Sequence, residues 1–209
     1  MIRPRATAVG RAASDPGCAG CPQMGTFRAL RRAGLAVQGG LACDAAAADP
    51  LAPATGRWAA VAGVGEALRR GPAALLDEAA RAGARAVVLT GPPGARAARL
   101  RGALAAAGAR VLELDPARVR AAEEAVARAV AEPGAALVAL AACPRGRPRG
   151  APVAIDGRRC NRCGACLSLA CPAIGDPGGE ALEVDPSVCS GCGLCAPLCR
   201  AGAIAVAPR

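Results

Sequence analysis

The chain of 209 residues contains no histidine and no tyrosine, one tryptophan and one phenylalanine, and its basic residues are all arginine because lysine is absent as well. Without histidine there can be no zinc site of the mixed Cys/His kind, and the commonest general base is missing. So few aromatic side chains leave a core of Ala, Val and Leu, which suits helices packed closely on a sheet. They also argue against nucleic-acid binding by base stacking.

The formal net charge is +10. The arginines are scattered singly or in pairs, which is typical of a solvated basic surface rather than of a nucleic-acid-binding stripe. A second interpretation is a surface that docks an acidic redox partner. No segment reaches the roughly 18 uninterrupted apolar residues of a membrane span, and residues 1–17 lack the apolar stretch of a signal peptide. We therefore expect a cytoplasmic protein.

The chain has 12 cysteines, and in a reducing compartment they are expected to be metal ligands rather than disulfides. Eight of them form two similar blocks, one starting at Cys160 and one at Cys189. The blocks indicate an internal duplication with a repeat of about 29 residues.

Each block is a C-x2-C-x2-C run followed by a fourth Cys, a spacing that wraps three thiolates around one 4Fe-4S cluster while the fourth reaches another cluster. All-cysteine zinc sites normally use two separated C-x2-C pairs instead. In bacterial ferredoxins with two clusters, the fourth Cys crosses between them. We therefore predict two ligand sets: Cys160, Cys163, Cys166 and Cys199 for the first cluster, and Cys189, Cys192, Cys195 and Cys171 for the second.

Two departures from the usual pattern leave every ligand in place. The first block has four residues before its last Cys where three are common, and Arg200 stands where a Pro is expected. Between the ligands, small residues let backbone N–H groups approach the sulfurs: Gly164, Ala165, Gly191 and Gly193. A module of under about 60 residues with almost no aromatics buries little surface, so we expect the clusters to act as its core.

Before the blocks, apolar strands alternate with amphipathic helices, which predicts an α/β domain with a parallel sheet. The spacing predicts helices at 24–33, 66–81, 95–107 and 116–131, and strands at 35–37, 58–62, 84–89, 110–114 and 135–140, with a loop at 45–56. The Pro- and Gly-rich residues 144–152 predict a linker. The predicted organisation is an arm (1–17), an α/β domain (18–143), the linker, and a small α+β ferredoxin-like domain with two clusters (153–209).

Four cysteines lie outside the two blocks: Cys18, Cys21, Cys43 and Cys143. The first two form a C-x-G-C-P run, the third follows two glycines, and the last precedes a proline. One interpretation is a vacant or zinc-binding knuckle at the first pair, with the other two as buried small apolar side chains.

The order of these parts resembles the C-terminal half of the large subunit of indolepyruvate:ferredoxin oxidoreductase, of the 2-oxoacid:ferredoxin oxidoreductase family. The similarity rests on the C-x-G-C-P run, the α/β segment, the Ala-Cys-Pro at 142–144 and the Cys-Pro-Ala-Ile at 171–174. The resemblance implies that the α/β domain is a truncated thiamine-diphosphate-type domain. It also implies that Cys18, Cys21, Cys43 and Cys143 hold a third 4Fe-4S cluster.

The family's thiamine diphosphate motif begins with Gly-Asp-Ser, which falls here on Gly63, Val64 and Gly65. Val64 replaces the magnesium-binding Asp and offers no oxygen ligand. The Asn that ends the motif is missing from Thr90-Gly91-Pro92-Pro93, and Gln23 stands where the family usually has His. These residues argue against binding of thiamine diphosphate and magnesium.

Three functions fit the sequence. The first is an iron-sulfur relay, as a subunit or degenerate paralogue of such an oxidoreductase, in a hetero-oligomer with redox partners such as ferredoxin or the other subunits. The second is a catalytic fragment that oxidatively decarboxylates aryl pyruvates with a partner chain. The third is an iron-sulfur regulator that binds nucleic acid. We expect the first, without catalytic residues of its own, because electron transfer needs no acid, base or nucleophile.

Overall fold

The computed structural model describes residues 19–39, 56–132, 134–144 and 147–206. The predicted arm, Cys18, Cys43 and most of the predicted loop at 45–56 lie outside these residues. The chain divides into two compact units. The α/β unit is Gly25–Cys143, and the described part of the other, the cysteine-rich unit, is residues 19–24, 144 and 147–206.

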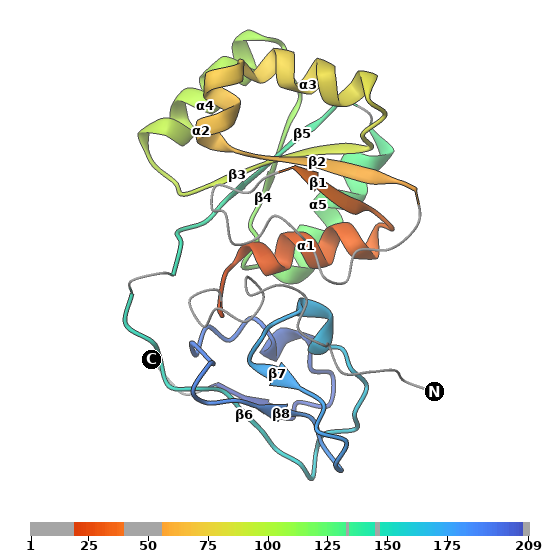
Figure 1. Cartoon of the computed structure of the whole chain (residues 1–209), viewed down its shortest axis with the longest axis vertical. Helices are drawn as coiled ribbons and strands as arrows, with labels where there is room; N and C mark the ends of the chain where they lie inside the picture. The colour runs from red at the N-terminus through yellow and green to blue at the C-terminus, as the bar shows by residue number, and fades with distance from the viewer. Residues whose placement is uncertain (1–18, 40–55, 133, 145–146, 207–209) are drawn as a thin grey trace. The chain divides into compact units, whose positions relative to one another are not determined.

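The α/β unit is built on a five-stranded sheet in which every neighbouring pair is parallel, with the order β1-β2-β3-β5-β4 (Figure 1). The strands are β1 (Ala36–Gly39), β2 (Trp58–Gly63), β3 (Ala86–Gly91), β4 (Val111–Leu114) and β5 (Ala136–Leu140). All six residues of β3 are buried, as a strand covered on both faces requires. The predicted α/β class with a parallel sheet is confirmed.

Helices cover both faces of this sheet (Figure 1). One face carries α1 (Gln23–Arg32) and α5 (Val119–Ala131), and the other carries α2 (Val64–Arg70), α3 (Pro72–Arg81) and α4 (Ala95–Ala106). Leu30, Val126 and Leu137 belong to the apolar cluster of the first face, and Leu89 and Leu100 to that of the second. Alanines fill much of both clusters, which allows the helices to approach the strands closely.

The single helix predicted over 66–81 is wrong, because the structure has two helices there. Gly71 separates them with φ +85° and ψ 118°. Pro72 follows it, and a proline disfavours helical geometry in the residue before it. The helix predicted from residue 116 also begins later, at Val119. Before it, the Asp115 carboxylate accepts a hydrogen bond from the Ala117 N–H at 2.9 Å, which stabilises a turn instead.

The cysteine-rich unit contains two short antiparallel strand pairs, β6 (Ala154–Ile155) with β9 (Ile204–Ala205), and β7 (Ile174–Gly175) with β8 (Glu183–Val184). The duplication is visible in its turns. The Cys160 N–H donates to the Asp156 carbonyl at 2.9 Å, and the Cys189 N–H donates to the Asp185 carbonyl at the same distance. Each cysteine run then enters a 3-10 helix, at Leu167–Leu169 and Ala196–Leu198.

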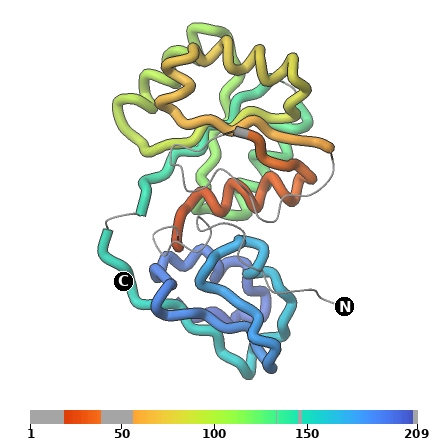
Figure 2. Tube along the Cα trace, viewed as in Figure 1, coloured from red at the N-terminus to blue at the C-terminus, as the bar shows by residue number. Residues whose placement is uncertain are grey.

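The segment predicted as a linker, 144–152, carries neither helix nor strand in its described residues. Figure 2 follows the trace through this segment into the cysteine-rich unit. The compact units group residues 19–24 with the C-terminal residues, whereas the predicted domain boundaries group them with the α/β domain. Among the described helices, none is long and apolar enough to cross a membrane.

Candidate metal centres in the cysteine-rich unit

The four cysteines predicted for the first cluster line one cavity. Cys160, Cys163 and Cys166 come from the loop after β6, and Cys199 comes from the end of the second block. Apolar side chains complete the wall, among them Ile155, Leu182 and Ile204. The structure therefore brings a ligand from the second block to the three cysteines of the first.

The second cavity is lined by the reciprocal set: Cys171, Cys189, Cys192 and Cys195. Val153, Leu169 and Leu194 contribute apolar wall. Gly20 and Met24, which sequence reasoning did not connect with this site, also line it.

Backbone N–H groups point at the sulfurs. The Gly191 N–H donates to Cys189 Sγ at 3.5 Å, and the Ala203 N–H donates to Cys199 Sγ at 3.2 Å. Gly191 has φ +71°, and a Cβ there would lie 2.4 Å from the Ala151 carbonyl oxygen. Glycine is therefore required for the loop to adopt this conformation. Such N–H donors stabilise negative charge on sulfur.

Burial raises the pKa of the Cys166 and Cys171 thiols. It also raises the pKa of Cys195 to about 12, with the neighbouring Cys192 and Cys171 as smaller causes. Buried thiolates crowded together repel one another, so the charged form needs a cation among them. Each cavity therefore brings together thiols whose charged forms a bound cation would stabilise.

The donor chemistry identifies the kind of metal group that fits. Four sulfurs without oxygen or nitrogen select iron-sulfur clusters, zinc or copper(I). Within the described ranges, no three Cys, Asp or Glu side chains are close enough to hold a single metal ion. The four thiols of each set instead surround a cavity, and an apolar cavity with four cysteines fits a 4Fe-4S cluster.

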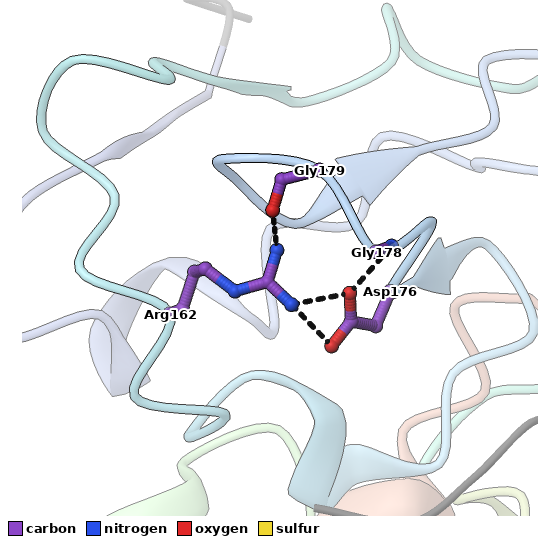
Figure 3. A network of polar contacts seen from close by, with 4 residues as sticks. All are labelled: Arg162, Asp176, Gly178 and Gly179. Carbon is purple, nitrogen blue, oxygen red and sulfur yellow. Dashed lines mark hydrogen bonds and ion pairs between the residues drawn. The ribbon is translucent and has the colours of Figure 1, made fainter.

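An ion pair stabilises the ligand loop of the first set (Figure 3). Arg162, between Cys160 and Cys163, donates through Nη2 to both carboxylate oxygens of Asp176, at 2.7 Å and 2.9 Å, and through Nη1 to the Gly179 carbonyl. The Gly178 N–H donates to Asp176 Oδ1 at 2.9 Å and orients the carboxylate. Sequence reasoning missed this contact, although the Asp-Pro-Gly-Gly turn at 176–179 signals an Asp that bonds its own turn.

The other predicted ligands are Cys18, Cys21, Cys43 and Cys143. Cys21 is half-buried just before α1, and Cys143 is exposed after β5. They belong to different units, and the remaining two lie outside the described residues. The third ligand set stays a prediction.

Gly63, Val64 and Gly65, which the resemblance aligns with the start of a thiamine diphosphate motif, lie where β2 ends and α2 begins. Val64 is 3% exposed and belongs to an apolar cluster. A Cβ on Gly91, the last residue of β3, would lie 2.9 Å from Val64 Cγ2. The Val64 side chain therefore packs directly on the backbone of the neighbouring strand, at the edge where ligands bind in open parallel sheets.

Comparison with protein families bears on the cysteine blocks. Residues 182–205 match the 4Fe-4S binding domain family. The span contains Cys189, Cys192, Cys195 and Cys199. The chain thus carries a 4Fe-4S binding domain, which supports a role in iron-sulfur electron transfer. Comparisons with curated proteins and with solved structures gave no match.

Proposed function

We propose that this chain is an electron-transfer protein with two 4Fe-4S clusters, one in each cysteine-lined cavity. The observation that carries the proposal is that each cavity is lined by three cysteines of one block and the fourth cysteine of the other. This is the crossed arrangement of two-cluster ferredoxins. The first cluster takes Cys160, Cys163, Cys166 and Cys199, and the second takes Cys189, Cys192, Cys195 and Cys171.

A 4Fe-4S cluster supplies one-electron uptake and release. The residues of the chain hold it, exclude water from it and stabilise the added charge. The thiolates bind iron, the apolar walls shield it, and the N–H donors of Gly191 and Ala203 stabilise the reduced state. None of these tasks requires a proton-transfer group, which agrees with a chain that has no histidine.

The wider context follows from the resemblance. We propose a subunit or degenerate paralogue of a 2-oxoacid:ferredoxin oxidoreductase, with a third cluster at Cys18, Cys21, Cys43 and Cys143 and with ferredoxin or another subunit as redox partner. The α/β unit would derive from a thiamine diphosphate domain. The contact between Val64 and Gly91 supports the loss of cofactor binding, because it puts apolar side-chain volume where the family has a magnesium ligand.

The test uses the full chain purified without oxygen, reduced with dithionite and examined by electron paramagnetic resonance (EPR). Cys199→Ser is expected to remove the same signal as Cys163→Ser, and Cys171→Ser the same signal as Cys192→Ser. Glu113→Gln, on β4 of the α/β unit, is the control that leaves both signals. If Cys199→Ser instead removes the signal lost in Cys192→Ser, the crossed assignment is wrong. If the reduced chain shows no iron-sulfur signal, the proposed function fails.

A further inference from the structure

Residues 19–24 lie against the second ligand set although they are far from it in the sequence. Gly20 and Met24 line the second cavity together with its four cysteines. Figure 2 shows the red start of the described chain reaching the blue trace of the C-terminal residues. The described residues that line the first cavity, by contrast, all lie in the range from Ile155 to Ile204. The second cavity is therefore lined in part by residues that lie outside the two duplicated blocks.

Gly20 fits this wall only because it has no side chain. A Cβ there would lie 2.0 Å from Ser190 Oγ and 3.2 Å from Cys192 Cβ. The backbone has φ +81°, a conformation that favours glycine. Within the described part of the chain, Ser190 Oγ is buried without a hydrogen-bond partner, so the contact with Gly20 is close packing. The Gly20 backbone thus packs directly on the ligand loop between Cys189 and Cys192.

Gly20 also lies beside a ligand of the second set. Burial raises the pKa of the Cys171 thiol, and the backbone groups of Ala173 and Gly20 oppose that rise. Gly20 and Cys171 line the same cavity. Solvent exposure is one of the factors that set the reduction potential of a cluster. Gly20 therefore lies where it covers the second site.

We propose that residues 19–24 form a cap on the second cluster, in which Gly20 is a positioning residue that packs on the ligand loop between Cys189 and Cys192 and keeps water from the cluster. The inference rests on the proposed function, since it requires a cluster in the second set. It makes the two clusters unequal, because among the described residues this segment lines the second cavity and not the first.

The test compares Gly20→Ala with Gly83→Ala in the full chain. Gly83, in the α/β unit, has φ +82° with no atom within 4 Å of a Cβ, so it reproduces the backbone strain without the contact. The readouts are an EPR-monitored redox titration and the rate of cluster loss in air. Gly20→Ala is expected to shift the midpoint potential of the second cluster and to speed its loss roughly tenfold, with the first cluster unchanged. Gly83→Ala should change neither cluster.

Rescue tests the contact itself. Ser190→Gly removes both the Oγ and the Cβ that the new methyl group meets, so Gly20→Ala with Ser190→Gly should recover most of the lost stability of the second cluster. If Gly20→Ala prevents folding, hydrogen exchange of the wild-type protein tests the cap instead. The Gly20 amide is expected to be protected from exchange when the cluster is bound.

The outcomes separate two failures. A wild-type protein without a second cluster contradicts the proposed function. If the wild-type protein holds both clusters, but Gly20→Ala behaves like Gly83→Ala or the Gly20 amide exchanges freely, the cap alone is overturned.

Discussion

Arg162 binds Asp176 through a single guanidinium nitrogen that lies 2.7 Å from one carboxylate oxygen and 2.9 Å from the other. Arg162 belongs to the ligand loop of the first cluster site, and Asp176 follows β7. The two side chains are 34% and 33% exposed, so water screens the pair only in part. The ion pair therefore connects a ligand loop to a turn elsewhere in the cysteine-rich unit.

Asp176→Asn should weaken this ion pair while keeping an acceptor for the Gly178 N–H. A partly exposed ion pair contributes up to about 1 kcal/mol, so the first cluster should be lost about 2- to 5-fold faster in air. The measurement is the decay of the first EPR signal. Glu113→Gln breaks a comparable pair with Arg101, at 2.7 Å and 3.1 Å in the α/β unit, and should leave both signals unchanged. Equal decay in both variants would show that the Arg162 pair does not support the cluster.

Val64→Asp introduces the carboxylate that the proposed family has at this position into a site that is packed for an apolar side chain. A buried carboxylate without a partner costs several kcal/mol, so the free energy of unfolding of the α/β unit should fall by about 3 kcal/mol or more. Denaturant unfolding measures the loss, with Val64→Ala as the milder control. Calorimetry with thiamine diphosphate and magnesium should detect no binding to either variant or to the wild-type chain. Stoichiometric binding by the wild-type chain would reinstate the catalytic interpretation.

Gly91→Ala tests the contact that fills this motif position. The added methyl group would lie 2.9 Å from Val64 Cγ2, and such overpacking typically costs about 1–3 kcal/mol. In a Val64→Ala background the Cγ2 atom is gone, so the same change should cost less. A double-mutant cycle of unfolding free energies measures the coupling. Additive effects of the two substitutions would mean that the two residues are not in contact.

Cluster assembly should depend on pH, because iron binds thiolates and must displace protons. Burial raises the pKa of Cys166 in the first set, and of Cys171 and Cys195 in the second, with Cys195 at about 12. Without a cluster, the folded state favours the protonated form of these thiols. Their contribution to the free energy of unfolding is therefore fully present below about pH 9 and is lost as the pH rises towards 12. For the cluster the sign is reversed, since protons compete with iron, so loading should improve from about pH 7 to about pH 9.

Chemical reconstitution at a series of pH values measures this dependence, in variants that each keep one complete ligand set. Cys160→Ser isolates the second set and Cys189→Ser isolates the first. The yield of loaded cluster should rise more steeply with pH for the second set than for the first, since the second set contains two thiols with raised pKa. A yield that does not change with pH, or a steeper rise in the first set, would contradict the assigned cause.

The alternation of apolar strands and amphipathic helices was enough to predict the parallel sheet, because both periodicities are local properties of the sequence. The cysteine runs are also local, and each wraps one cavity. The break at Gly71 was hidden because the leucine spacing continues across it from Leu68 to Leu75. The Arg162 ion pair and the packing of Gly20 on Ser190 join segments that are distant in sequence. No local period encodes such contacts, so only the folded chain reveals them.

The content of iron, acid-labile sulfide and zinc per chain, measured on the full chain purified without oxygen, tests the central claim most directly. Two clusters predict about eight irons and about eight sulfides, and a third cluster at Cys18, Cys21, Cys43 and Cys143 raises both to about twelve. Zinc without sulfide would contradict the account, because it would mean that the cysteines of the two cavities bind single ions and carry no electrons.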